Sequence, residues 1–162
     1  MRGYFGIGII NGKCEANIGT LWRSANIMGA GFIFTIGKRY PKRQATDTMD
    51  TPKHIPLYEY ETYEDFKKNL PRGCEIIAVE LDERSKPIEG LNHPERAVYL
   101  LGAEDKGIPM EVLADCNRII QLPGTHCLNV SVAGSIIMYD RNLKTSLSEG
   151  KKLNKKIEYA ET

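Results

Sequence analysis

The stretch Ala97-Val98-Tyr99-Leu100-Leu101 is the clearest buried strand of the 162-residue sequence, and Gly102 follows it directly. An unbroken apolar run of this length is typical of a strand that is covered on both faces of a parallel sheet. Shorter apolar runs of the same kind occur before and after it. We expect strands at residues 4–10, 32–36, 58–61, 75–81, 97–101 and 118–122.

Segments with helical spacing of apolar residues alternate with these strands. We expect helices at residues 18–28, 63–70, 110–116 and 129–147. Strands that alternate with helices predict an α/β domain, with a mostly parallel sheet and helices on both of its faces. We expect one domain over residues 1–150 and a polar tail over residues 151–162.

The charge of the chain does not decide whether it binds a nucleic acid. The chain has 22 basic and 21 acidic residues, so its net charge of +1 does not by itself indicate a nucleic-acid partner. Two basic patches are present, and each is either an RNA contact or solvated surface. They comprise Lys38, Arg39, Lys42 and Arg43, and Lys151, Lys152, Lys155 and Lys156.

The cysteines and histidines form no cluster with the spacing of metal ligands. Four cysteines and three histidines lie far apart, which argues against a zinc site and against a secreted disulfide framework. The longest uncharged stretch, residues 119–139, is interrupted by proline, glycine and polar residues, unlike a membrane span. We therefore expect a soluble, cytoplasmic protein without metal.

Ligands of open parallel sheets bind at the carboxyl ends of the strands, where three loops carry unusual residues. In the first loop, Asn17 is placed to cap a helix and Gly29 to end it, while Leu21 and Ala25 face the core. Arg23 follows the cap by about a turn and a half and is expected to share a pocket with the helix N-terminus. Such a pocket suits an anion. The alternative is a cap with a surface arginine.

The second loop follows the strand at residues 97–101. Gly102 allows a ligand to approach the backbone, and Pro109 suits the first turn of a helix. Glu104 places a carboxylate at the mouth of the sheet, where it would orient a polar ligand. The alternative is an ordinary turn between a strand and a helix.

The third loop runs from Leu122 to Ser135 and opens the last helix. Asn129 is either a helix cap or a ligand-binding amide. The small residues Ala133, Gly134 and Ser135 permit close approach of a ligand or of another backbone.

Taken together, the three loops resemble the three signature motifs of the SpoU/TrmH family of SPOUT methyltransferases. The first motif, N-x-G-x-x-x-R-x-A followed by G-A, is matched by Asn17, Gly19, Arg23, Ala25, Gly29 and Ala30. The second, G-x-E-x-x-G-(I/L)-P, is matched by Gly102, Glu104, Gly107, Ile108 and Pro109. The third, (I/L)-P followed by S-L-N-V-S, is matched by Leu122, Pro123, Leu128, Asn129, Val130 and Ser131. One position departs from the pattern, because Cys127 stands where the family has serine.

The resemblance implies a fold, a reaction and a set of partners. The fold would contain a C-terminal deep trefoil knot, and the protein would be a homodimer with its active site near the subunit interface. The reaction would transfer a methyl group from S-adenosylmethionine to a ribose 2′-hydroxyl of tRNA or rRNA, with tRNA favoured. The implied catalytic residues are Arg23, Asn17, Glu104 and Asn129. The implied cofactor-binding residues are Val79, Leu101, Gly102, Ile120, Leu122, Cys127 and Leu128.

Three alternatives remain open from the sequence. The first alternative is an enzyme with the same fold that methylates a base instead of a ribose, for example at a guanine nitrogen. A binding-only protein would hold RNA or cofactor without turnover, which the intact Arg23 disfavours. A nucleotide-binding oxidoreductase is disfavoured because no G-x-G-x-x-G opens a strand–helix unit.

Overall fold

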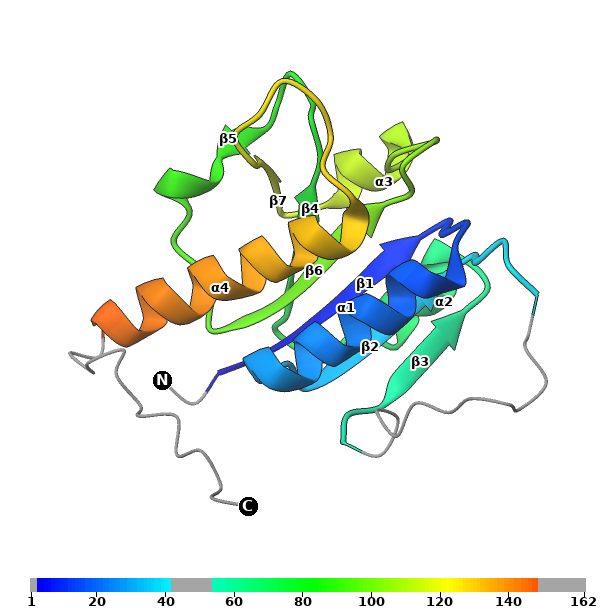
Figure 1. The fold of residues 1–162 in the computed structure, drawn as a ribbon, viewed down its shortest axis with the longest axis horizontal. Coiled ribbons are helices and arrows are strands. Elements are labelled where there is room, and N and C mark those ends of the chain that lie inside the picture. Colours follow the sequence, from blue (N-terminus) through cyan, green and yellow to red (C-terminus); the bar gives the residue numbers. More distant parts are fainter. Residues whose placement is uncertain (1–2, 42–53, 149–162) are drawn as a thin grey trace, which may run out of the picture.

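A computed structural model describes residues 3–41 and 54–148 of the chain. Its core is a seven-stranded sheet in the order β3-β2-β1-β6-β4-β7-β5, and every pairing in it is parallel (Figure 1). The strands are Tyr4–Ile10 (β1), Phe32–Ile36 (β2), Leu57–Tyr60 (β3), Glu75–Val79 (β4), Lys86–Pro87 (β5), Arg96–Gly102 (β6) and Arg118–Gln121 (β7). The predicted α/β class is confirmed.

The two longest strands form the centre of this sheet. β1 and β6 pair along their full length, from Tyr4 opposite Arg96 to Ile10 opposite Gly102. Both are almost wholly buried, as their unbroken apolar runs predict. Because the strands are parallel, the loops that follow β1 and β6 emerge side by side at one edge of the sheet.

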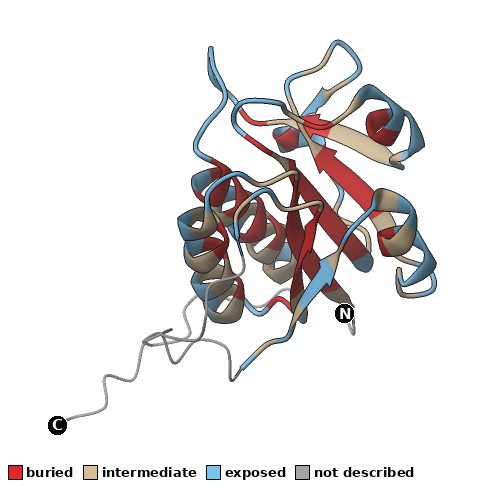
Figure 2. Ribbon diagram, turned by 90° about the vertical axis from the view of Figure 1, so that its right-hand side faces the viewer, coloured by how far each residue is buried: buried red, intermediate tan, exposed pale blue. Residues whose placement is uncertain are grey.

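Helices cover both faces of the sheet (Figures 1 and 2). The helices are Glu15–Met28 (α1), Tyr63–Lys68 (α2), Met110–Asp115 (α3) and Val130–Ser148 (α4). α1 and α4 share one buried cluster with one face of the sheet, and α2 and α3 share a second cluster with the other face. Figure 2 shows the buried residues concentrated in the sheet and on the inward sides of the helices. The predicted helices on both faces are confirmed.

Small residues let α1 and α4 approach closely. A Cβ atom on Gly134 would lie 2.4 Å from Leu21 Cδ1, which is closer than real contacts allow. Further along the same helix pair, Ser135 Oγ donates to Ser24 Oγ at 3.1 Å, and the Asn142 amide donates to the Met28 carbonyl at 3.0 Å. The small residue Gly134 therefore serves helix packing rather than a ligand.

The start of α1 differs from the prediction. The helix begins at Glu15, with Cys14 at the N-cap position and no side-chain cap, so Asn17 lies in the first turn and does not cap the helix. The acidic side chain of Glu15 suits the positive end of the helix dipole. The end of the helix is as predicted, because Gly29 adopts the left-handed conformation with φ 86°.

The short strand β5 and the 3-10 turn at Ile88–Gly90 were not predicted, because Lys86 and Pro87 are exposed and carry no apolar pattern. The deep trefoil knot stays a prediction from the resemblance. Lys42, Arg43 and the tail at residues 151–162 lie outside the described residues. Within those residues, no helix has the length and apolar character to cross a membrane, and no group of His, Cys, Asp and Glu forms a metal site.

Candidate active site

The three loops meet in one hydrogen-bond network whose centre is Asn129. The Asn129 side-chain amide donates to Asn17 Oδ1 at 3.2 Å and to Glu104 Oε1 at 2.8 Å. Its Oδ1 accepts from the backbone N–H groups of Ser131 and Val132, at 3.0 and 3.4 Å, and from Ser131 Oγ at 2.6 Å. Asn129 is thus both the cap of α4 and the link between the loops, so its role as a helix cap is confirmed and its role towards a ligand stays a prediction.

The topology of the sheet explains why these residues meet. Asn17 lies in the first turn of α1, which follows β1, and Glu104 lies two residues beyond β6. The loop after β6 is held tight by a bridge between Ala103 and Gly107, and Gly107 adopts a φ of 63°. Three of the four predicted catalytic residues are therefore brought together.

Two pockets open on either side of this network. The β7 pocket, about 180 Å³, lies at the ends of β4, β6 and β7. It is lined by Val79, Glu80, Leu81, Leu101, Gly102, Ala103, Glu104, Gly107, Leu122, Pro123, His126, Cys127, Leu128, Val130 and Ala133.

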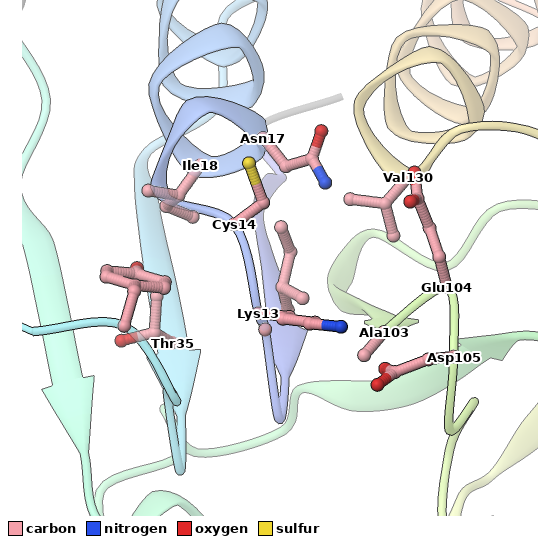
Figure 3. Close-up of a pocket in the computed structure, with 12 residues that line it drawn as sticks. Lys13, Cys14, Asn17, Ile18, Thr35, Ala103, Glu104, Asp105 and Val130 are labelled. Carbon is pink, nitrogen blue, oxygen red and sulfur yellow. The ribbon is translucent and has the colours of Figure 1, made fainter.

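The β2 pocket, about 140 Å³, lies at the ends of β1, β2 and β6 (Figure 3). It is lined by Ile9, Gly12, Lys13, Cys14, Asn17, Ile18, Thr35, Tyr40, Ala103, Glu104, Asp105 and Val130. The two pockets share Ala103, Glu104 and Val130, so ligands in both would meet beside the network.

Most of the predicted cofactor-binding residues line the β7 pocket. Those that do so are Val79, Leu101, Gly102, Leu122, Cys127 and Leu128. Ile120 does not: it is only 2% exposed and belongs to the core cluster beneath α1 and α4. Strand alternation turns its side chain into that core, where it supports the pocket wall from behind.

Gly102 has a structural reason to be glycine that the sequence does not reveal. A Cβ atom there would lie 2.6 Å from the Gly107 carbonyl carbon and 2.7 Å from the Ile108 nitrogen. The missing side chain therefore makes room for the chain's own backbone, which folds over the end of β6. Gly102 also lines the β7 pocket, so the expectation that a ligand approaches its backbone stays a prediction.

Glu80 is a pocket residue that the sequence analysis missed. It follows β4, and its carboxylate accepts hydrogen bonds from the backbone N–H groups of Leu81 at 2.9 Å and Ile108 at 3.0 Å. Its charge and the burial of the thiol raise the pKa of Cys127, burial being the larger cause. Cys127 is therefore a neutral thiol at neutral pH. The only sequence signal for Glu80 was its place at the carboxyl end of a strand.

Arg23 lies away from this network in the same chain. It is exposed, lines neither pocket, and makes no hydrogen bond or ion pair with residues 3–41 or 54–148. The expectation that it shares a pocket with the start of α1 is wrong, because the helix begins at Glu15. Eight residues of α-helix separate the two positions, a rise of about 12 Å.

The described half of the first basic patch is paired with carboxylates. Lys38 forms an ion pair with Glu59. Arg39 forms a bidentate ion pair with Asp105, with nitrogen–oxygen distances of 3.0 and 2.5 Å. The Arg39 guanidinium lowers the pKa of Asp105 to about 2. Arg39 thereby ties the loop after β2 to the loop after β6, at the rim of the β2 pocket.

With this geometry in view, comparison with known proteins identifies the family. The model of the SpoU rRNA Methylase family matches residues 7–139. The chain belongs to this family. The SpoU family assignment confirms the resemblance that the three loops carry.

Individual relatives agree with the family assignment. A Borreliella burgdorferi protein named tRNA (guanosine(18)-2′-O)-methyltransferase is 28% identical over 149 residues, which cover 85% of this chain and 68% of the relative. An Archaeoglobus fulgidus protein, named as an uncharacterized tRNA/rRNA methyltransferase, is 28% identical over 137 residues, or 77% of this chain. The SpoU chain spans 58% of that relative's length.

A solved structure shares the fold. The AdoMet-bound rRNA methyltransferase from Sinorhizobium meliloti superimposes with a TM-score of 0.78 at 22% identity. The match covers 89% of this chain and 57% of that one.

Proposed function

We propose that this SpoU protein transfers a methyl group from S-adenosylmethionine to a ribose 2′-hydroxyl of tRNA, in the cytoplasm. Family membership and the name of the Borreliella relative support the reaction class and the choice of tRNA. The observation that carries the proposal is the network of Asn17, Glu104 and Asn129 at the meeting point of two pockets. Two reactants held in the two pockets would face each other there.

The β7 pocket fits the chemistry of S-adenosylmethionine. Its apolar walls, formed by Leu101, Leu122 and Leu128, suit an adenine ring. The carboxylates of Glu80 and Glu104 suit the positive charge of a sulfonium. When bound, the cofactor supplies a methyl group that is already activated towards nucleophiles. Val79, Gly102 and the loop at Cys127 would complete the wall around it.

The network residues would position the acceptor ribose. Asn17 and Asn129 offer neutral amides, and Glu104 offers a carboxylate that accepts hydrogen bonds. Well-oriented reactants gain roughly 7–11 kcal/mol from proximity alone, so positioning is the main contribution that these side chains make. The 2′-hydroxyl must also lose its proton, and we assign that assistance to Arg23. Its guanidinium would lower the pKa of the hydroxyl or orient an RNA phosphate that accepts the proton.

Because Arg23 is remote from the network of its own chain, this role requires a second copy of the protein. The outer sides of α1 and α4 carry large apolar residues that are exposed, namely Ile27, Val132, Ile136 and Tyr139. Gly19 on the same helix as Arg23 has no atom within 4 Å of the place its Cβ would take. We propose that a homodimer buries this face and brings Arg23 to the acceptor site of the partner.

Three measurements test the proposal. Calorimetry should show binding of S-adenosylmethionine that survives a chelator, and light scattering should give a mass near twice 18.2 kDa. Total tRNA from cells that lack the gene should gain 2′-O-methylated nucleosides when it is incubated with the protein and S-adenosylmethionine. A methylated base in the digest would favour base methylation instead, and binding without turnover would favour the binding-only alternative.

Arg23→Ala should reduce methyl transfer by at least about 10²-fold, the lower end for lost proton-transfer assistance. Cofactor affinity should change little, because Arg23 does not line the β7 pocket. Arg23→Lys should not restore the rate fully, since an ammonium lacks the planar fork of a guanidinium. Transfer at the unaltered rate by Arg23→Ala would refute the assigned role, while cofactor binding and the fold would stand.

A further inference from the structure

Thr35 on β2 carries a buried hydroxyl without a partner. The residue is 2% exposed, and its Oγ1 is the only buried side-chain nitrogen or oxygen without a hydrogen bond in residues 3–41 and 54–148. A buried polar atom left unpaired costs about 1–3 kcal/mol. Valine has nearly the same shape and would avoid this cost. A threonine at this position therefore indicates a ligand that completes the hydrogen bond.

The hydroxyl belongs to a residue that lines the β2 pocket, outside the part of the site described for the cofactor. This pocket lies between the loops that follow β1 and β6 (Figure 3). The loop after β1 leads to α1 on one face of the sheet, and the loop after β6 leads to α3 on the other. Neighbouring strands whose loops diverge in this way form the crevice where open parallel sheets bind ligands.

The walls of the pocket suit a nucleobase. The Tyr40 ring supplies an aromatic surface, and burial raises the pKa of Tyr40 to about 12, so the phenol stays neutral. Aromatic side chains bind unstacked bases through their faces and edges. Lys13 extends towards the rim at Asp105 (Figure 3), where its ammonium would attract the phosphate of a bound nucleotide. The Arg39–Asp105 pair links the loops after β2 and β6 at this rim.

We propose that the β2 pocket binds the acceptor nucleotide, with Thr35 Oγ1 hydrogen-bonded to its base and Tyr40 against the base. Its ribose would then lie at the shared wall of Ala103 and Glu104, beside the amide of Asn129. This inference rests on the proposed methyl transfer and adds Thr35 and Tyr40 as specificity-determining residues. It gives the base a site that is separate from the cofactor's.

The test compares Thr35→Val with the matched control Thr35→Ser. The substrate is total tRNA from cells that lack the gene, with radiolabelled S-adenosylmethionine as methyl donor. Thr35→Val should reduce kcat/KM for tRNA by about three- to tenfold, the range for one lost neutral hydrogen bond. Its thermal stability should stay equal or rise, because the unpaired hydroxyl is gone. Thr35→Ser should keep the rate within about twofold but lose stability, since it removes a buried methyl group.

Two further measurements separate this site from the rest of the enzyme. Affinity for S-adenosylmethionine, measured by calorimetry, should be the same in the unaltered chain and in both variants. Tyr40→Leu should reduce kcat/KM about tenfold while Tyr40→Phe retains it, because base stacking on an aromatic ring contributes about 1–3 kcal/mol.

The outcomes distinguish the two proposals. Unaltered transfer by Thr35→Val, or an equal loss in Thr35→Val and Thr35→Ser, would overturn the base site and leave methyl transfer standing. A loss of cofactor affinity that matches the loss of rate would also overturn it, because the defect would then lie in the β7 pocket. No transfer to tRNA by the unaltered chain would overturn the proposed function and this inference with it.

Discussion

Asn129 combines two roles that substitution can separate. Asn129→Ala removes the acceptor that caps α4 together with the amide that donates to Asn17 and Glu104. Loss of such a cap costs about 1 kcal/mol. For a chain of this length that corresponds to a fall of about 2–4 °C in Tm. Without the amide, Asn17 and Glu104 are free to shift, which should cost about 10²-fold in methyl transfer, because a misplacement of roughly 1 Å has an effect of that size.

Asn129→Ser is the matched control. Serine caps helices about as well as asparagine, so its side chain can still accept the backbone N–H groups of Ser131 and Val132. It is too short to carry the amide to Glu104. Thermal unfolding should therefore show nearly unaltered stability, while transfer of labelled methyl to tRNA falls as it does in the alanine variant. If serine restored the rate together with the stability, Asn129 would be a helix cap only, and the network would have no part in catalysis.

Other residues give further tests. Cys127→Ser restores the family residue at little steric cost, so transfer should be equal or faster; a loss above about tenfold would assign the thiol a role. Gly102→Ala should lower thermal stability as well as cofactor affinity, because its Cβ meets the backbone at Gly107; affinity lost at unaltered Tm would contradict that geometry. Burial lowers the pKa of His93, which lies between Tyr99 and Asp140. The unfolded chain then binds the proton more readily, so the contribution of His93 to the free energy of unfolding should be fully present above about pH 7 and be lost as the pH drops through about 6.5. His93→Gln should remove that part of the pH dependence in denaturant titrations.

Sequence patterns predicted the sheet well because a central parallel strand leaves a strong signal. The runs at β1, β2 and β6 are mostly apolar, and their predicted bounds differ from the observed ones by at most a residue at either end. The two-residue β5 has no such signal, because its place beside β7 depends on the route of the chain rather than on its own residues. Local patterns thus predict the elements that bury most apolar surface.

Predictions for the site failed where they depended on orientation. The assignment of Asn17 as a cap placed the start of α1 three residues too late, and this error moved Arg23 into a pocket that it does not line. Ile120 was assigned to the cofactor from the family resemblance, but strand alternation turns its side chain into the core. Motif spacing predicts which loop or element a residue belongs to. The direction of its side chain follows instead from the register of the strand or the phase of the helix.

The way in which the site is assembled also accounts for its position in the fold. Asn129 contacts a residue 112 positions earlier in the chain and another 25 positions earlier, and both come from loops next to central strands. Those loops are adjacent only because β1 and β6 pair along their full length. The β2 and β7 pockets therefore form together with the centre of the sheet, the part that buries most apolar surface. Rigid elements on both sides of the two pockets would suit the proposed methyl transfer, because small displacements at a site that works by positioning are costly in rate.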